Sequence, residues 1–307
     1  MIPETFFLSP EIIKAQQLNQ PIVALESAVI THGLPRPYNL ELACDLEAII
    51  RGENVTPATV GLIDGRIHVG LSQAELQRLA SEPKTRKISR RDFGIAIAAT
   101  ECGGTTVAGT LIAARTAGLH VFATGGIGGV HRNSTFDISA DLEELSRSPL
   151  VVVCAGAKAI LDLPATLEVL ETRGVPVIGY QTDEFPAFYS LSSGLPVTAR
   201  ADTPAQVASI ARAQWETGIL AAVLVVIPPP AEFAIPADEV EESIRQALAE
   251  AEQKKIHGAA VTPFLLGRVS ELSGGVSLKA NLALLKNNAR LASQIATELA
   301  ISHKNVF

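Results

Sequence analysis

The stretch from Val121 to Lys158 constrains the fold of this chain more than any other. It begins with an apolar run, passes through a glycine cluster at residues 125–129 and a short helical pattern, and reaches a second apolar run that ends at Cys154. Apolar strand, polar loop, helix and apolar strand is the order of α/β proteins, whose chemistry lies at strand ends. We therefore predict an α/β fold with a site built around this stretch.

The composition favours a mostly parallel sheet covered by helices. Of the 307 residues, 47% are hydrophobic and 5% aromatic, and the apolar ones are mainly Ala, Val, Leu and Ile. That bias suits strands that are buried on both faces. Charged residues make up 19%, which excludes extensive disorder. No linker, low-complexity tract or internal repeat interrupts the chain, so we expect a single domain over residues 1–307.

Charge and patterning exclude several classes of function. The net charge of −7 provides no basic surface for a nucleic-acid polymer, whereas a small anion needs only a local positive pocket. No apolar run reaches the roughly 18 to 20 residues that span a bilayer, and the N-terminus lacks a secretory pattern. Cys44, Cys102 and Cys154 show no CxxC spacing. We expect a cytoplasmic protein with reduced thiols and no membrane partner.

Apolar runs and turn signals give a coarse map of the elements. The expected strands are Pro21–Ile30, a hairpin over Ala58–Gly70 around Asp64-Gly65, His120–Thr124, Leu150–Cys154, Val175–Thr182 and Leu220–Ile227. The expected helices are Pro10–Leu18, Pro37–Arg51, one after Ser72, Thr105–Gly118, one after Ser139, Leu163–Arg173, Thr203–Gly218, Pro236–Ile256, one after Thr262 and Ser277–Leu299.

Glu26 and Lys158 are the two residues that fit their surroundings least. Glu26 interrupts an apolar run, and a carboxylate there must be paired, hydrogen-bonded or functional; we favour a function. Lys158 follows a buried strand among small residues, which is the placement of an imine-forming lysine whose pKa is lowered by desolvation. A lysine whose amine reaches solvent from the next helix is an equally weighted interpretation.

The polar residues of the central stretch allow two interpretations. The glycine cluster lacks the third glycine of the dinucleotide fingerprint, because His131 stands in its place, and it is not a P-loop. It retains a backbone that can turn N–H groups toward an anion. Asp137 and Asp141 suit a hard divalent cation such as magnesium or manganese, but singly each is more simply a helix-start acid after the cap Ser139.

Two further regions carry candidate ligand contacts. The basic run Lys84–Asp92 leads into a helix and is suited to an anion site, although such runs usually lie in solvent. In the last helix, Asn281, Asn287 and Asn288 are poor helix formers. We expect two of these three asparagines on the surface and one turned inward toward a ligand.

Taken together, the motifs resemble the pseudouridine-5′-phosphate glycosidases, a family that is also called indigoidine synthase A-like. The resemblance covers nearly the whole chain and rests on long, unusual strings. They are VALESAVITHGLPRP, KISRRD, TTVAGT, FATGGIGGVHR, TFDISADL, VVVCAGAK, LETRGVPVIGYQT, PAF, TPFLLGRV and SLKANLALLKNNA. The segment between His131 and Thr135 is shorter than the family pattern.

The resemblance implies an enzyme, a pseudouridylate synthase of the carbon–oxygen lyase class. It would reversibly cleave the C–C glycosidic bond of pseudouridine 5′-phosphate to uracil and ribose 5-phosphate through a lysine imine on the ring-opened sugar. It also implies a three-layer α/β/α core with a mostly parallel sheet and long C-terminal helices, a homotrimer, and a divalent cation, typically Mn²⁺.

Residue by residue, the resemblance implies Lys158 as the nucleophile and Glu26 as the proton donor. Asp137 would bind the metal. Substrate contacts would come from Lys87, Val107, Ser139, Ala140 and Asp141, with Thr124, His131 and Asn281 as further pocket residues, the first two near phosphate.

Two other classes of protein remain open at this point. One is a different lyase or aldolase that acts on a sugar phosphate through the same imine lysine. The other is a non-catalytic protein that binds a small ligand. The combination of Glu26, Lys87, Asp137 and Lys158 argues against the second class, because a binding protein has no use for an imine-forming lysine.

Overall fold

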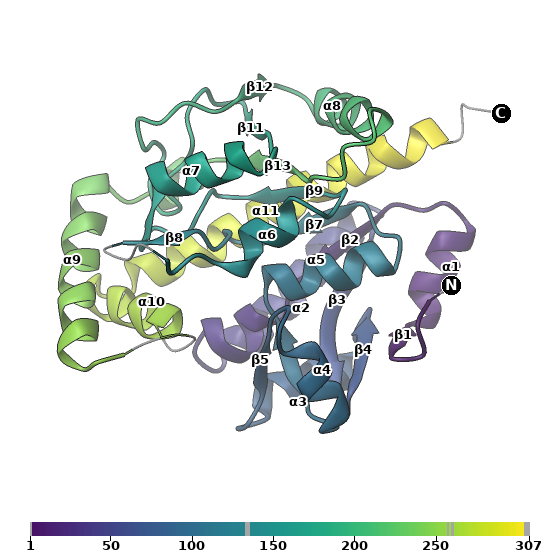
Figure 1. Cartoon of the computed structure of the whole chain (residues 1–307), viewed down its shortest axis with the longest axis horizontal. Coiled ribbons are helices and arrows are strands. Elements are labelled where there is room, and N and C mark those ends of the chain that lie inside the picture. Colours follow the sequence, from purple (N-terminus) through teal and green to yellow (C-terminus); the bar gives the residue numbers. More distant parts are fainter. Residues whose placement is uncertain (1, 133–135, 257, 259–260, 304–307) are drawn as a thin grey trace.

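A computed structural model describes residues 2–132, 136–256, 258 and 261–303. The fold is the expected three-layer α/β/α arrangement around a mostly parallel sheet (Figure 1). The main strand order is β1-β4-β3-β2-β7-β9-β13-β11-β12, and β5 and β6 branch from β3. All neighbouring pairs from β3 to β12 along this order are parallel, whereas β3 pairs antiparallel with β4 and β6.

The strands are short, and most of them correspond to the apolar runs of the sequence. Their bounds are β1 Phe6–Leu8, β2 Ile22–Leu25, β3 Thr56–Ile63, β4 Arg66–Val69, β5 Arg86–Ile88, β6 Gly103–Thr105, β7 Val121–Ala123, β8 Val130–His131, β9 Val151–Cys154, β10 Leu161–Asp162, β11 Val177–Tyr180, β12 Ala199–Ala201 and β13 Val223–Val226. The predicted hairpin is confirmed, because Asp64 and Gly65 form the turn that connects the antiparallel strands β3 and β4.

The helices are α1 Pro10–Gln17, α2 Tyr38–Gly52, α3 Gln73–Ser81, α4 Phe93–Ala98, α5 Val107–Thr116, α6 Ala140–Leu145, α7 Leu163–Thr172, α8 Pro204–Glu216, α9 Ala237–Gln253, α10 Val261–Leu272 and α11 Val276–His303. A π-helix, η1, covers Val29–Gly33, and a 3₁₀ turn, η2, covers Ala231–Phe233. The long C-terminal helices that the family resemblance implies are therefore present.

Helices cover both faces of the sheet. Helices α5 and α6 pack together on one face, and α11 crosses the other face against β2, β7 and β9, with α2 beside it (Figure 1). Small residues let α5 lie close to its neighbours: a Cβ on Gly109 would stand 2.6 Å from the carbonyl oxygen of Ile88. The parallel strands are buried on both faces as a result, as in β9 and β13, whose residues are all buried.

The prediction of a strand over Pro21–Ile30 is wrong beyond Leu25. The chain leaves the sheet at Glu26, and Ser27 takes over the local hydrogen bonding. Its hydroxyl donates to the carbonyl of Val60 and accepts the N–H of Thr105, while its own carbonyl accepts the N–H of Ile30. A polar side chain that satisfies neighbouring backbone replaces the strand ladder, and the chain turns into η1.

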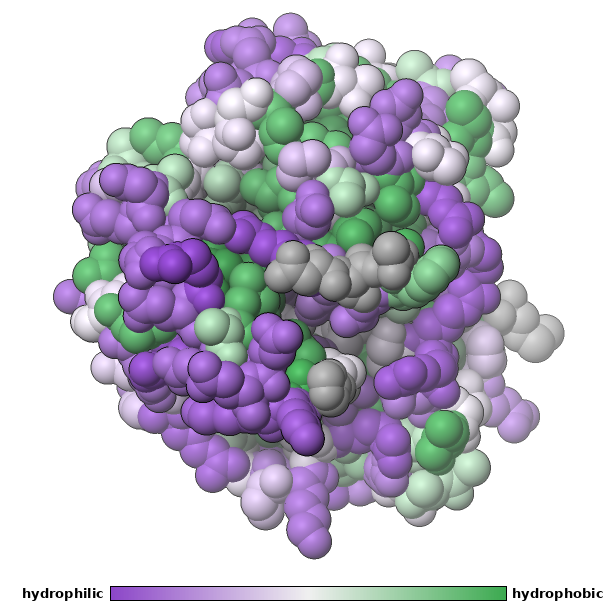
Figure 2. All heavy atoms as spheres, turned by 60° about the vertical axis from the view of Figure 1, so that its left-hand side comes forward, coloured by the Kyte–Doolittle hydropathy of each residue, from purple (hydrophilic) through white to green (hydrophobic). Residues whose placement is uncertain are grey.

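Figure 2 shows one face of the molecule, on which hydrophilic side chains predominate and apolar ones are visible in the depressions between them. Among the described residues, no helix combines the length and apolar character that a membrane crossing requires.

Candidate active site

A cavity of about 670 Å³ lies at the carboxyl ends of the central strands. Glu26 follows β2, Gly125 and Gly126 follow β7, and Lys158 stands a few residues beyond β9. These three strands are neighbours in the order β2-β7-β9, so their carboxyl ends bring together residues from distant parts of the chain. The cavity therefore forms where ligands bind in open α/β sheets.

Lys158 is half-buried in this cavity. Its Nζ donates to the carbonyl oxygen of Gly126 at 2.8 Å, and its backbone N–H donates to Ile127 at 3.1 Å. Both contacts come from the glycine-rich segment after β7. The hydrogen bond to Gly126 thus holds the amine against the cavity wall. A lysine amine has further N–H groups, and this residue lines the cavity, where a ligand can meet them.

Glu26 stands next to this lysine. Burial raises the pKa of its carboxyl group above the ordinary value, while the nearby Lys158 and a hydrogen bond from the Thr124 hydroxyl act in the opposite direction. Burial is the largest effect, so the carboxyl group is easier to protonate than an exposed glutamate. A proton donor near neutral pH requires such a shift.

Thr124 lies beneath the cavity wall and is 1% exposed. Its hydroxyl donates to Glu26, and its carbonyl accepts the Nδ2 of Asn288 at 2.8 Å. The structure therefore connects Thr124 to the carboxyl group of Glu26, whereas the sequence interpretation placed it as a pocket residue near phosphate. Thr124 is not among the residues that line the cavity, and its hydroxyl binds Glu26 in place of a ligand.

Lys87 lines the same cavity from β5. Burial lowers its pKa, and repulsion by Lys158 adds to the effect, while Asp141 and Glu26 oppose it. Two lysines and two carboxyl groups therefore interact within one enclosed space. Shifts caused by burial together with neighbouring charges are typical of functional sites, because catalytic groups need pKa values that are matched to their task.

Ser139, Ala140 and Asp141 line the cavity at the start of α6. Ser139 caps the helix as predicted, accepting the N–H of Asp141 at 3.2 Å. The Asp141 carboxylate is buried and accepts two backbone N–H groups, from Ala108 at 2.9 Å and from Gly128 at 2.8 Å. Asp141 thus fastens the N-terminus of α5 to the glycine-rich segment, a structural role that its spacing alone did not reveal.

The glycine cluster is required by packing within the protein. A Cβ on Gly128 would stand 2.2 Å from the Ser139 hydroxyl, and one on Gly129 would stand 2.3 Å from the Thr166 hydroxyl. A Cβ on Gly126 would meet the ring of Phe188 at 2.6 Å. The expectation of an anion-binding backbone is met in part by the protein itself, because the N–H of Gly128 binds the carboxylate of Asp141.

Asp137 and His131 lie at the edge of the cavity, and Asp137 is exposed. The backbone N–H of His131 donates to the carbonyl of Asp137 at 2.9 Å. Within the described ranges, no three His, Cys, Asp or Glu side chains are grouped to hold a metal ion. One carboxylate on a cavity wall fits a hard cation that keeps most of its water and binds to the substrate as well. The segment 133–135, including the expected shortening, lies outside the described residues.

The asparagines of α11 depart from expectation. Asn281 lines the cavity, as predicted, but Asn287 is half-buried and Asn288 is fully buried. The Asn288 side chain points inward and donates a hydrogen bond to the carbonyl of Thr124, while its Oδ1 has no hydrogen-bond partner among the described residues. Periodicity could not reveal this, because a polar residue on a helix face normally marks the solvent side.

Sequence reasoning also missed an ion pair at the cavity wall, in which the carboxylate is buried and the arginine is half-exposed. Glu144 of α6 is 1% exposed, and its Oε1 accepts a hydrogen bond from Nη1 of Arg90 at 2.6 Å. Arg90 lines the cavity. The basic run KISRRD was a signal for this residue, although only Lys87 was selected from it.

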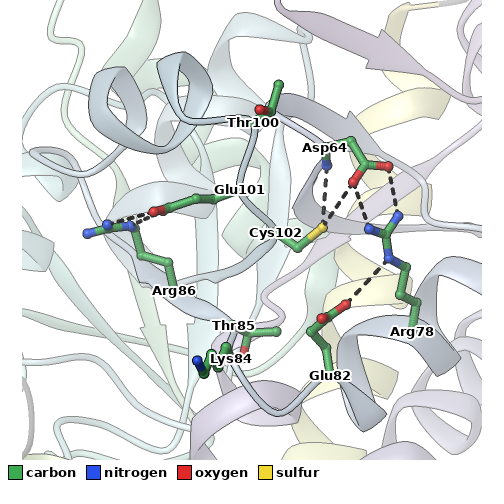
Figure 3. Close-up of a pocket in the computed structure, with 9 residues that line it drawn as sticks. All are labelled: Asp64, Arg78, Glu82, Lys84, Thr85, Arg86, Thr100, Glu101 and Cys102. Atoms are coloured by element: carbon green, nitrogen blue, oxygen red, sulfur yellow. Dashed lines mark hydrogen bonds and ion pairs between the residues drawn. The ribbon is translucent and has the colours of Figure 1, made fainter.

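A second hollow of about 500 Å³ has a different character (Figure 3). The guanidinium of Arg78 binds both carboxylate oxygens of Asp64 at 2.7 Å, and Arg86 pairs with Glu101. Cys102 contacts Asp64 as well, and burial raises the pKa of its thiol. Apart from Lys84, the charged side chains here point toward one another, so the hollow offers a ligand few groups in need of a partner.

The cavity at the strand ends therefore brings together a lysine, a carboxyl group that is easily protonated and further cationic side chains. This arrangement is typical of α/β enzymes that act on small molecules. The model of the family described as "Indigoidine synthase A like protein" matches residues 11–298. The chain belongs to this family, and it is an enzyme.

Relatives of known name are similar over nearly their full length. The pseudouridine-5′-phosphate glycosidase of Solibacter usitatus is 54% identical over 95% of this chain and 98% of its own. That of Paracoccus denitrificans is also 54% identical, over 97% and 100%.

Solved structures agree with these relatives. The prealnumycin C-glycosynthase in complex with ribulose 5-phosphate is 40% identical, with a TM-score of 0.91 over 99% of both chains. An indigoidine synthase A-like protein of Thermotoga maritima is 37% identical, with a TM-score of 0.89 over 96% of both chains.

Proposed function

We propose that the chain reversibly cleaves the C–C glycosidic bond of pseudouridine 5′-phosphate, giving uracil and ribose 5-phosphate. The observation that carries the proposal is the meeting of Lys158 and Glu26 in one cavity, in a chain 54% identical to named pseudouridine-5′-phosphate glycosidases. The C-glycosynthase with ribulose 5-phosphate also supports a sugar phosphate and the chemistry of a C-glycoside.

The bond to be cleaved explains why a lysine is needed. Ordinary glycosidases protonate a leaving oxygen between two carboxyl groups, but a C-glycoside has no such oxygen. The ring oxygen is the one oxygen at the anomeric carbon that can be protonated. Glu26, whose pKa is raised by burial, donates a proton to it while the amine of Lys158 attacks the anomeric carbon.

Opening of the sugar ring precedes cleavage of the C–C bond. The bond from the anomeric carbon to the ring oxygen breaks, and a bond to Nζ of Lys158 forms. The attached nitrogen then loses a proton, and its lone pair forms the C=N bond of a protonated imine while the C–C bond to uracil breaks; the electrons of that bond take up a proton at the uracil carbon. Water hydrolyses the imine and releases ribose 5-phosphate and the amine.

Other cavity residues would bind the substrate. Lys87, Val107, Ser139, Ala140, His131 and Asn281 all line the cavity, in agreement with the contacts that the family resemblance implies. Asp141 would act from the wall, where its carboxylate holds two backbone N–H groups in place.

A divalent cation, typically Mn²⁺, would bind at Asp137. When bound, it would supply positive charge and ordered water near the substrate. The homotrimer implied by the resemblance remains a prediction, which light scattering of the purified protein tests.

Uracil release tests this function. The purified protein with manganese is incubated with pseudouridine 5′-phosphate, and uracil and ribose 5-phosphate are measured by chromatography. We expect equal amounts of both, loss of activity with a chelator and recovery with added manganese. Cleavage of another sugar phosphate but not of this one would favour the lyase or aldolase alternative, and activity unchanged by a chelator would contradict the metal proposal.

A further inference from the structure

The ion pair between Arg90 and Glu144 is unusual for its unequal exposure. The Glu144 side chain is 1% exposed, whereas the Arg90 side chain is 49% exposed. A carboxylate is costly to bury unless it is paired, and Arg90 is the partner that compensates it. The fold thus places a buried charge behind the cavity wall and an arginine on the wall.

The geometry leaves most of the guanidinium available. Glu144 accepts a hydrogen bond from Nη1 of Arg90 at 2.6 Å. A guanidinium carries five N–H donors in a planar fork, and one contact fixes its orientation while leaving donors on its other edge. Because Arg90 lines the cavity, that edge can meet a ligand there.

The surroundings of Arg90 favour an anion. Ser89, Thr106 and Val107 line the same cavity, and Thr106 caps the N-terminus of the ten-residue helix α5. The N–H groups of Ala108 and Gly109 at this N-terminus are already bound by Asp141 and Thr106, so the guanidinium, and not the helix, supplies the positive charge for an anion. Arg90 also lies three residues beyond Lys87, which interacts electrostatically with Glu26 and Lys158. A phosphate at Arg90 would therefore be joined to a sugar near the reacting groups.

We propose that Arg90 binds the 5′-phosphate of the substrate through the free edge of its guanidinium, and that Glu144 is a positioning residue which holds this edge toward the cavity. The inference rests on the proposed function and names the residue that selects the phosphorylated substrate over the free nucleoside. Planar, two-pronged recognition of phosphate is the task for which arginine surpasses lysine.

Substrates with and without phosphate test the inference. Uracil release is measured from pseudouridine 5′-phosphate and from pseudouridine with the wild-type protein and Arg90→Gln. For the nucleotide we expect KM to rise about 30-fold and kcat to change less than about 3-fold, because the lost contact is to a group remote from the reacting bond. For the nucleoside we expect kcat/KM to change less than about 2-fold.

Control variants separate this role from structure and from net charge. Arg90→Gln leaves Glu144 without its partner, so the double variant Arg90→Gln/Glu144→Gln removes the unpaired charge and should show the same loss of phosphate selectivity. Glu144→Gln alone should raise KM for the nucleotide by a smaller factor. Arg173→Gln removes the same charge from an exposed arginine that pairs with Glu143 and does not line the cavity, and it should change KM less than about 3-fold.

Binding of ribose 5-phosphate provides a readout that does not depend on turnover. Calorimetry should show at least about 10-fold weaker binding to Arg90→Gln than to the wild-type protein. Equal losses for nucleotide and nucleoside, equal losses in Arg173→Gln, or unchanged binding of ribose 5-phosphate would overturn the inference. If the wild-type protein releases no uracil but binds ribose 5-phosphate through Arg90, the proposed function fails and the phosphate site stands.

Discussion

Two hollows lined by charged side chains use their charges in opposite ways. Around Asp64, Arg78, Arg86 and Glu101, each charge is matched to a partner in direct contact, and these side chains are between 34% and 62% exposed. In the strand-end cavity, Glu26 accepts a hydrogen bond from a neutral hydroxyl and Lys158 donates to a backbone carbonyl. Glu26 and Lys158 therefore interact electrostatically without forming an ion pair in direct contact.

The difference teaches where to look for chemistry. Solvent screens the exposed ion pairs, so they contribute little to the free energy of folding. Their charges are bound to one another and are not available to a substrate. The enclosed groups keep perturbed pKa values, as with the raised pKa of Glu26 and the lowered pKa of Lys87. A hollow whose charged side chains pair with one another is a surface feature. A hollow whose charged side chains keep shifted pKa values without such pairing is a candidate active site.

The largest expected effect is that of removing the amine at position 158. Lys158→Ala should lower kcat for uracil release by about 10⁴-fold or more, because no other described group replaces a covalent nucleophile. Lys158→Arg keeps a positive charge but cannot form an imine, and it should be equally inactive. Borohydride added during turnover should attach the sugar to Lys158 of the wild-type protein, as mass spectrometry of the digested protein can show. Normal turnover by Lys158→Ala would refute the mechanism.

Replacement of the proton donor should have the next largest effect. Glu26→Gln keeps the shape but cannot donate a proton, so kcat/KM should fall about 10²- to 10⁴-fold. In the wild-type protein, kcat/KM should decline as pH rises through the raised pKa of Glu26, because the protonated form is the active one. This decline should be absent from Glu26→Gln.

Glu47 provides a matched control for Glu26. It is also largely enclosed, its pKa is also raised by burial, and it accepts a hydrogen bond from the Thr59 hydroxyl at 2.6 Å. It does not line the cavity. Glu47→Gln should therefore retain the pH profile of the wild-type protein, and a shifted profile would mean that burial, and not position, controls the titration.

Removal of the hydroxyl beneath the cavity should produce a smaller, directional change. The hydrogen bond from Thr124 favours the ionised form of Glu26, so Thr124→Val should raise the pKa of Glu26 further. The alkaline decline of kcat/KM should move to higher pH, by up to about one unit, while the maximum falls less than about 10-fold. Thr59→Val, which removes the corresponding hydroxyl from Glu47, should leave the profile in place. A shift to lower pH in Thr124→Val would contradict the assigned hydrogen bond.

The second hollow should respond least. Arg78→Ala breaks the exposed pair with Asp64 and should lower the free energy of unfolding by less than about 1 kcal/mol in chemical denaturation. Cys102→Ser should be nearly neutral. Both variants should keep kcat/KM within about 2-fold of the wild-type value. A large loss of activity in either variant would show that this hollow communicates with the active site.

Much of the fold follows from local patterns, and its exceptions have physical causes. Long apolar runs such as Leu150–Cys154 predicted the central strands, because both faces of a parallel sheet are buried. Strands β1 and β12 have three residues each, too few to establish a period. Strand β2 ends at Leu25, earlier than predicted, because the hydroxyl of Ser27 binds neighbouring backbone groups in place of the strand ladder.

The candidate site could be predicted where one residue conflicted with its surroundings. Glu26 in an apolar run and Lys158 after a strand carried such a signal, and the structure brings both into one cavity. Glu144 carried none, and the signal at Asn288 did not distinguish it from Asn281 and Asn287, because a polar residue in a helix looks the same whether its face turns inward or outward. Their roles depend on partners 54 and 164 residues away, at Arg90 and Thr124.

The bond from Asn288 to Thr124 and the bond from Thr124 to Glu26 have a consequence for how the protein matures. They join residues separated by 164 and 98 positions, so Glu26 cannot reach its final position until the end of β2, the end of β7 and α11 have met. Contacts of such long range form late, because closing long loops is entropically costly before other contacts compensate. During refolding, helical content should therefore return before catalysis, and a chain cut short within α11 would fold around a cavity that lacks its support.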